Sequence, residues 1–183
     1  MSPEKHRDQR ITNSEELNES IDYWLKELDR YSFEQLCIQP SPGSWSIGQV
    51  YVHLIGNTEY FILQAKICAS TNENQHEEPS AAGKNLLLKN EFPDKLIEGP
   101  PQNAQTRQPT SKQELVEGLN QLKLEIVEAE KLVAESSFKG KTKHPGLQYF
   151  NSREWLQFAA MHFRHHLRQK KRIDDYLSQL VPR

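Results

Sequence analysis

Two histidines, His162 and His166, lie four residues apart in the segment WLQFAAMHFRHHLRQKKRIDDYLSQL, residues 155–180. Apolar side chains in this segment recur in steps of three, four or seven residues, which predicts one long amphipathic helix. The apolar stripe passes through both histidines, at positions where such a helix normally carries leucine. Side chains four residues apart lie on neighbouring turns, so two imidazoles can converge on one metal ion.

A packing role is the alternative for this pair, because a histidine on an apolar stripe is usually a hydrogen-bonded core residue. Each histidine brings two ring nitrogens, and a buried one without a partner costs about 1–3 kcal/mol. The pair alone therefore leaves metal binding and packing open. His165 lies one residue off the stripe, beside Arg164 and Arg168, and is predicted to lie on a solvated face.

A third histidine, His53, belongs to an earlier predicted helix. Ser46 and Gln49 fit a capping box at the start of this helix, and apolar residues at helical spacing continue it to about Cys68. His53 adjoins the apolar stripe. On its own it is more typical of a structural histidine, so its importance depends on the other pair.

Four start signals of the capping-box type divide the chain into four amphipathic helices. Such a pattern favours an all-α protein, with an antiparallel four-helix bundle as the leading architecture and residues 1–183 as one domain. Residues 1–12 are predicted to be a loose, charged lead-in. In a bundle the second and fourth helices can face each other, so that His53 meets the histidine pair. The predicted helices span about 13–30, 46–68, 111–135 and 151–180.

The longest predicted connection is residues 70–110, which are rich in Asn, Gln, Glu and Pro. A loop of this length is unusual in a compact domain and tends to be functional or disordered. Apolar residues between 86 and 97 predict that this part packs across one end of the bundle, whereas 70–84 and 99–110 fit a mobile surface insertion equally well. The two shorter connections, 32–45 and 136–150, are predicted to be turns.

Composition narrows the class of protein. The 183 residues are enough for one hydrophobic core, and the net charge of −2 gives no general attraction to nucleic acid or anionic lipid. The basic run at 164–172 is offset by Asp174 and Asp175 and fits a solvated helix face.

No apolar run approaches the roughly 20 residues that span a bilayer, and the N-terminus is charged. We therefore expect a cytoplasmic protein without a membrane or nucleic-acid partner, with Cys37 and Cys68 as reduced thiols.

Three neutral imidazoles around one divalent ion leave at least one coordination position open, which is the arrangement of catalytic rather than structural zinc. Nitrogen ligands also suit nickel, copper or iron, and zinc and nickel are the leading candidates. Asn57 and Gln169 near the histidines are neutral, and Glu59 lies off the His53 face. The sequence therefore shows no evident general base.

Three stretches of the chain resemble the DinB-like superfamily, which includes YfiT-like metal-dependent hydrolases. PSPGSWSIGQVYVHLIGNTEYF, residues 40–61, is similar to the family's W-S-x-x-x-x-x-x-H-L segment. HPGLQYFNSREWLQF, residues 144–158, is similar to the turn before its last helix. HFRHHLRQ, residues 162–169, is similar to its H-x-x-H-H-x-x-Q segment. With the helix spacing, the resemblance covers most of the chain apart from residues 70–110.

The resemblance implies an up-down-down-up four-helix bundle, often dimeric. It also implies a metal held by one histidine of the second helix and by the i, i+4 pair of the fourth. By that resemblance the ligands are His53, His162 and His166. This set agrees with the helical stripe, which leaves His165 out. Ligation requires neutral imidazole, so metal binding is expected to weaken below roughly pH 6.

The implied activity is metal-dependent hydrolysis of a small molecule, or transfer of a low-molecular-weight thiol similar to bacillithiol, mycothiol or glutathione. The alternative is a metal-binding or small-molecule-binding module without turnover. Either function needs a pocket, for which the candidate aromatic walls are Trp45, Tyr60, Phe61 and Trp155. We expect this pocket to open at one end of the bundle, near where Trp45 and Trp155 begin their segments, with residues 86–97 at its mouth.

Overall fold

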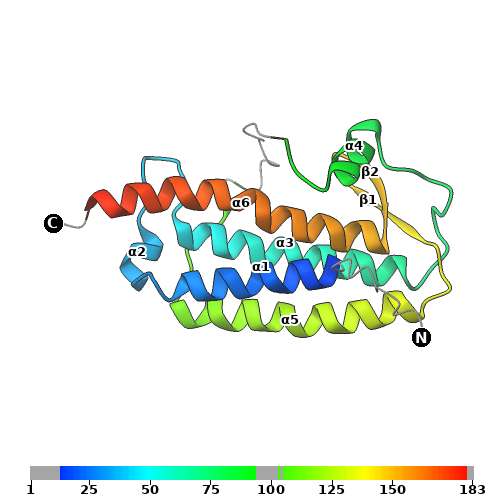
Figure 1. Ribbon diagram of the computed structural model, residues 1–183, viewed down its shortest axis with the longest axis horizontal. Helices are drawn as coiled ribbons and strands as arrows, with labels where there is room; N and C mark the ends of the chain where they lie inside the picture. Colours follow the sequence, from blue (N-terminus) through cyan, green and yellow to red (C-terminus); the bar gives the residue numbers. More distant parts are fainter. Residues whose placement is uncertain (1–12, 94–102, 104, 181–183) are drawn as a thin grey trace, which may run out of the picture.

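The structure is a computed structural model that describes residues 13–93, 103 and 105–180. It confirms the all-α class, with four long helices forming a bundle and a short helix and a hairpin beside one end (Figure 1). The predicted lead-in at residues 1–12, like Leu96 and Ile97, lies outside the described residues. The elements are α1 (Asn13–Leu28), α2 (Phe33–Cys37), α3 (Ile47–Cys68), α4 (Ala81–Lys89), α5 (Lys112–Glu135), β1 (Lys141–His144), β2 (Gln148–Asn151) and α6 (Ser152–Leu180).

The four long helices run up-down-down-up, as the family resemblance implies. Both α3 and α1 pack against α5 and α6. Figure 1 shows α1 and α6 running in one direction and α3 and α5 in the other. The four-helix bundle is confirmed, but the expectation that it is antiparallel is wrong for the consecutive helices α3 and α5, which are parallel. The chain must return along the length of α3 before α5 begins, which accounts for the long connection.

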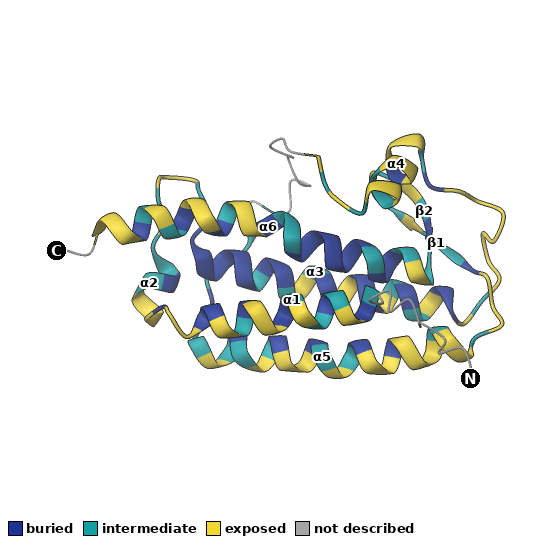
Figure 2. Cartoon of the chain, in the orientation of Figure 1, coloured by how far each residue is buried: buried dark blue, intermediate teal, exposed yellow. Residues whose placement is uncertain are grey.

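The core lies between the apolar stripes of these helices, while their outward faces are exposed (Figure 2). On α1 and α5 the buried positions recur in steps of three and four residues, the period expected of a helix with one buried face. These two helices contribute a mainly apolar half of the bundle, in which Ser14 and Glu27 are the buried polar residues. Its completely buried members are Leu17, Ile21, Trp24 and Leu28 of α1 and Leu115, Leu119, Leu122, Ile126 and Ala129 of α5.

Two predicted caps set the starts of the helices that carry the histidines. The Ser46 hydroxyl accepts a hydrogen bond from the Gln49 backbone N–H at 3.1 Å, and the Gln49 side chain accepts one from Ser46 N–H at 3.0 Å. At α6, Asn151 Oδ1 accepts from Glu154 N–H at 3.0 Å while Glu154 Oε2 accepts from Asn151 N–H at 2.8 Å. These reciprocal bonds satisfy backbone donors that a helix leaves open at its N-terminus.

Three predicted loops contain regular structure. Residues 32–45 include α2, residues 136–150 include β1 and most of β2, and residues 70–110 include α4. Each element is short, and its apolar positions are too few to show a period in the sequence. Contacts with the bundle and with each other hold these elements in place, which a single-sequence pattern does not reveal.

Helix α4 and the hairpin dock against each other. Pro79 pairs with Gln148 in an isolated antiparallel bridge, and Ser80 N–H donates to the Leu147 carbonyl at 2.9 Å. Gly83 on α4 allows this close approach, since a Cβ at that position would lie 3.1 Å from the same carbonyl. The two elements therefore form one unit beside the bundle (Figure 1).

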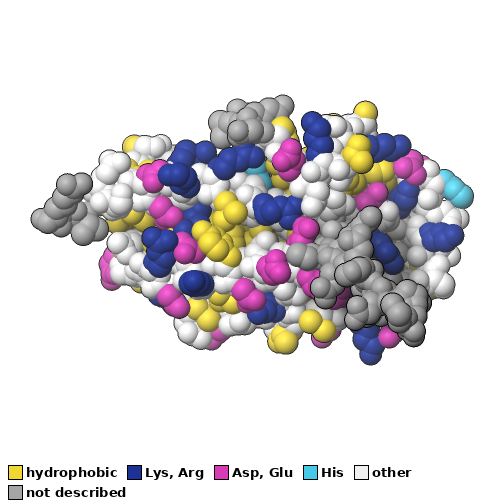
Figure 3. All heavy atoms as spheres, viewed as in Figure 1, with side chains coloured by type: hydrophobic (Ala, Val, Ile, Leu, Met, Phe, Trp, Pro, Cys, Tyr) yellow, Lys and Arg dark blue, Asp and Glu magenta, His cyan; other side chains and the backbone are white. Residues whose placement is uncertain are grey.

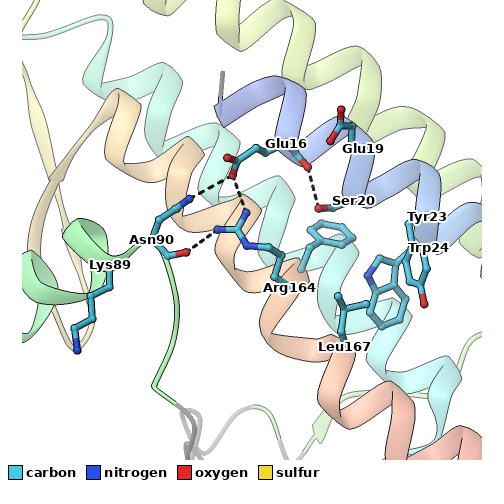
Figure 4. A pocket seen from close by; sticks show the side chains of 10 residues that line it. Glu16, Glu19, Ser20, Tyr23, Trp24, Lys89, Asn90, Arg164 and Leu167 are labelled. Atoms are coloured by element: carbon cyan, nitrogen blue, oxygen red, sulfur yellow. Dashed lines mark hydrogen bonds and ion pairs between the residues drawn. The ribbon is translucent and has the colours of Figure 1, made fainter. Parts of the chain in front are cut away.

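The end of α4 is tied to α1 and α6 by Arg164 (Figure 4). Its guanidinium donates to Glu16 Oε2 of α1 at 2.7 Å and to the Asn90 carbonyl at 2.8 Å. Gln157, two turns earlier on α6, donates to the Leu87 carbonyl at 2.8 Å. Arg164 was predicted to lie on a solvated face, but it is half-buried and fixes the position of α4.

The basic run of α6 does not form a single charged face. Lys170 is 2% exposed and pairs with Glu27 and Asp174, so its assignment to a solvated face is wrong. Charges of both signs are interspersed over the face drawn in Figure 3. Within the described part of the chain, no helix is both long and apolar enough to cross a membrane. Cys37 and Cys68 are free thiols.

Candidate metal centre

Three histidine side chains meet between α3 and α6. The Nε2 atoms of His53 and His162 are 3.2 Å apart, and those of His166 and His162 are also 3.2 Å apart. All three residues are buried, with exposed fractions of 7–8%. The antiparallel packing of α3 against α6 thus brings together the three residues that the sequence singled out.

The spacing of the three ring nitrogens fits a metal ion. Zn–N bonds of about 2.0–2.1 Å at tetrahedral angles place ligand nitrogens about 3.3 Å apart. One ring nitrogen from each histidine can be chosen so that all three lie within 4.8 Å of one another. A set of three neutral nitrogen ligands leaves a further coordination position for an exogenous molecule.

Hydrogen bonds among the histidines do not satisfy all three rings. A nitrogen of neutral imidazole either donates one hydrogen or accepts one. His162 Nε2 has two ring nitrogens at the same distance, so only one of these contacts can be a hydrogen bond. A cation at the centre accepts the lone pairs of all three Nε2 atoms at once. The donor set therefore fits a bound cation better than a hydrogen-bonded cluster.

Two neutral side chains contact the histidines. Gln169 Oε1 lies 2.8 Å from His166 Nδ1, so this nitrogen carries the hydrogen and Nε2 keeps its lone pair for a metal. Asn57 lies one turn from His53 on α3, with Nδ2 3.2 Å from His53 Nε2. The Gln169 contact orients the His166 ring for a metal, whereas the Asn57 amide donates to the same His53 lone pair that a metal would use.

Burial holds the three imidazoles in their neutral form. It lowers the pKa of His53 to about 4 and the pKa of His166 to about 3, and neighbouring histidines add to both effects. The pKa of His162 is also well below its ordinary value, mainly because of burial. Protons therefore compete with a metal only in acid. The expected weakening of metal binding below pH 6 moves to a lower pH.

His165 stands apart from the cluster but is not on a solvated face. It is half-buried, and its ring packs 4.8 Å from Phe92 and 5.2 Å from His166. The segment after α4 covers this side of α6, a contact that helical periodicity in α6 cannot reveal. The exclusion of His165 from the ligand set nevertheless agrees with the geometry, because the convergent group contains only the other three histidines among the described residues.

The three histidines line a cleft of about 1440 Å³. Trp45 closes one side, with its ring 4.8 Å from that of His53. Residues 86, 92 and 93 line the cleft as predicted, while 94–97 lie outside the described residues. The other walls come from α3 (Asn57, Tyr60, Phe61), α4 (Ala82, Asn85, Leu86, Lys89), the hairpin turn (His144, Pro145, Gly146, Leu147) and α6 (Phe158, His165, Arg168, Gln169, Arg172).

Trp155 is not a wall of this cleft. It is completely buried and stacks on Phe61 at 5.7 Å, beneath the cleft surface. Since α3 and α6 are antiparallel, Trp45 and Trp155 mark opposite ends of the bundle. The expectation that the site lies near the starts of both segments is therefore wrong for Trp155.

The cleft favours anions. Its described lining includes the cations Lys89, Arg168 and Arg172 and a single acidic residue, Glu91. A divalent ion at three neutral ligands would add two further positive charges. Field lines in a cleft concentrate such charge and raise the local concentration of an anionic ligand.

His144 is a lining residue that sequence reasoning missed. It ends β1, and its Nδ1 accepts a hydrogen bond from Gly146 N–H at 3.1 Å. The sequence HPG gave a turn signal, but only the packing of the hairpin on α6 places the imidazole in the cleft.

Comparisons with known proteins agree with this architecture. A sequence model of the DinB superfamily matches residues 16–169, a span that includes all three histidines. The uncharacterized protein YuaE of Bacillus subtilis (strain 168) is 24% identical over 161 residues, which cover 87% of this chain and 94% of that protein. No solved structure matches significantly. Because the family match extends over most of the chain, the protein belongs to the DinB superfamily.

Proposed function

We propose that the protein binds one divalent metal ion through His53, His162 and His166 and acts on a small anionic molecule at the remaining coordination position. The observation that carries this proposal is the pair of 3.2 Å contacts at His162 Nε2, which hydrogen bonds cannot both explain. The favoured reactions are hydrolysis and transfer of a low-molecular-weight thiol. Zinc and nickel are the leading metals.

A bound ion supplies a Lewis acid that lowers the pKa of a coordinated thiol or water. The protein's own residues hold and shield the reacting molecule. Gln169 keeps the hydrogen of His166 on Nδ1, and the cations Arg168 and Arg172 draw an anion toward the cleft. The rings of Phe61 and Phe92 lie within 6.4 Å of His162 and give its surroundings an apolar wall.

A second candidate is a binding module without turnover. It is favoured by the lack of a carboxylate beside the triad, since the one acidic residue in the described lining, Glu91, is exposed. Asn57 and Gln169 cannot move protons at neutral pH. A ligand could then bind the ion and leave unchanged.

A screen of the metal-loaded protein separates the two candidates. Low-molecular-weight thiols are combined with electrophiles, and simple amides and esters are tested for hydrolysis. Turnover by the wild-type protein and none by His53→Ala supports the enzyme. Tight ligand binding without turnover supports the binding module, and turnover that survives removal of the metal contradicts the proposed mechanism.

We also propose that the chain forms a homodimer, which the family resemblance implies. Two apolar side chains on the outer face of α5 support this: Leu124 is 63% exposed and Val127 is 61% exposed. Sedimentation velocity should give a mass of two chains. A mass of one chain that does not change with concentration would rule the dimer out.

A further inference from the structure

The hydrogen-bonding state of His144 is fixed by the hairpin turn. Gly146 N–H donates to His144 Nδ1, so this nitrogen must hold a lone pair and the neutral ring carries its hydrogen on Nε2. His144 Nε2 makes no hydrogen bond to any described residue, yet it is not among the buried polar atoms that lack a partner. Because His144 lines the cleft, its Nε2–H is available to a ligand there.

The imidazole of His144 is held rigidly. Its ring lies 5.5 Å from Trp155 and 4.9 Å from Phe158, and Trp155 Nε1 donates to Thr142 Oγ1 of the same strand at 2.8 Å. Gln148, its partner across the hairpin, has a φ of 67°, a left-handed conformation that costs a non-glycine residue roughly 1–2 kcal/mol. A donor fixed in this way loses little side-chain entropy when it binds a ligand.

An aromatic surface connects His144 with the candidate metal centre. Phe158 contacts the His144 ring at 4.9 Å and the Phe61 ring at 5.1 Å, and Phe61 contacts His162 at 5.5 Å. Both ends of this surface belong to one cleft. A ligand that lies across Phe158 and Phe61 can therefore reach the metal with one group and His144 with another.

We propose that His144 is a second recognition point of the cleft, whose Nε2–H donates a hydrogen bond to an acceptor oxygen of a ligand held at the metal. This inference rests on the proposed function and narrows its substrate class. The ligand is a small molecule with a metal-binding head group and, at its other end, an amide carbonyl or a carboxylate. Burial lowers the pKa of His144 to about 4, which keeps the ring neutral and a donor at Nε2 at neutral pH.

A purely structural role for His144 predicts different behaviour, and two variants separate the roles. His144→Asn retains an acceptor at the δ position for Gly146 N–H but removes the donor at the ε position. His144→Phe retains the ring that packs on Phe158 but removes both nitrogens. If His144 is only structural, the variants should lose thermal stability. If it recognises a ligand, the variants should lose affinity for ligands that carry an acceptor oxygen.

The experiment uses full-length protein loaded with Co²⁺, whose absorption reports a coordinated thiolate. The probes are N-acetylcysteine, which carries acceptor oxygens, and 1-propanethiol, which carries none. His144→Asn and His144→Phe should each weaken N-acetylcysteine binding about tenfold, the value of one hydrogen bond. Binding of 1-propanethiol should change less than twofold, and affinity for Co²⁺ should not change. In the metal-free wild type, ¹⁵N NMR of the histidine rings should show the hydrogen of His144 on Nε2.

Each other outcome has a distinct meaning. Equal weakening of both thiols, or no weakening of N-acetylcysteine, overturns the recognition role of His144. Co²⁺ binding without either thiol also overturns it and leaves the metal site intact. A wild-type protein that binds no metal overturns the proposed function itself. A hydrogen found on His144 Nδ1 in the metal-free protein contradicts the present inference whatever the metal result.

Discussion

Two buried polar clusters lie one turn apart on α6, and they differ in how their atoms are satisfied. Around Lys170, Nζ donates to Glu27 at 2.7 Å and to Asp174 at 2.6 Å, and the Tyr31 hydroxyl donates to Asp174 at 2.5 Å. Around His162, Nε2 faces two ring nitrogens and Nδ1 is buried with no hydrogen-bond partner among the described residues. The Lys170 cluster satisfies its polar atoms, whereas the histidine cluster does not and is compatible with a metal site.

The same contrast appears in the charges. Burial lowers the pKa of Lys170, but hydrogen bonds to Asp174 and Glu27 outweigh this and raise it above its ordinary value. Burial also dominates at His53 and His166, where no carboxylate offsets it, so both rings stay neutral. The cluster around Lys170 is stabilised by charged groups, whereas the cluster around His162 consists of neutral imidazoles.

The largest effect that should distinguish the clusters is acid destabilisation of the metal-free protein. In the unfolded chain histidine binds a proton near pH 6.5, whereas His53 and His166 in the folded protein bind one only near pH 4 and 3. Above pH 6.5 these histidines are neutral in both states and do not reduce the stability of the folded protein. As the pH falls toward 4, the unfolded chain binds protons that the folded protein does not, so the folded protein becomes less stable. Each of these histidines should lower the free energy of unfolding by about 1.4 kcal/mol for every unit that the pH falls between 6.5 and 4.

Urea unfolding at pH 7.5, 6.0 and 5.0 measures this slope. Replacing His166 with Leu should reduce the change of the free energy of unfolding with pH by the contribution of one histidine. Burial raises the pKa of the Glu27 carboxylate, but its contacts with Lys170 and Arg30 outweigh this and lower it, away from the pH range of the histidines. A stability that stays constant from pH 7.5 to 5.0 would show that the histidines are not held neutral.

Lys170→Met should give the next largest effect. The substitution leaves the carboxylates of Glu27 and Asp174 without their shared cation, and breaking such a buried pair costs about 3–5 kcal/mol. Metal affinity should not change, because Lys170 belongs to the other cluster. Denaturant unfolding and a metal titration give the two readouts.

Lys171→Met is the matched control for this variant. The Lys171 side chain is 74% exposed and pairs with Asp175 at the surface, where an ion pair contributes only about 0–1 kcal/mol. If the Lys170 and Lys171 variants are equally stable, the description of the Lys170 cluster as a structural element is wrong.

The smallest effect is expected from Gln169→Leu. This change removes the acceptor for His166 Nδ1–H, and loss of such a supporting contact typically weakens metal binding 10–100-fold. Gln169→Glu, which keeps an acceptor oxygen, should retain the affinity. Competition with a chelator measures both, and equal affinities for Gln169→Leu and the wild type would contradict the orienting role.

The sequence predicted what depends on local periodicity. The capping residues Ser46 and Asn151 placed α3 and α6 correctly, and the spacing of His162 and His166 placed both on the buried stripe. Local periodicity did not predict contacts between segments that are distant in the sequence. Lys170 is buried because Glu27 of α1 faces it, and His144 enters the cleft because the hairpin packs on α6.

Metal analysis of protein purified without a His-tag or chelator tests the central claim most directly. Elemental analysis of the wild type should give about one divalent ion per chain. His162→Ala and His166→Ala should contain none, and His165→Ala should contain as much as the wild type, because its ring lies outside the convergent group. Loss of the metal in His165→Ala together with its retention in His166→Ala would contradict the assignment of the site.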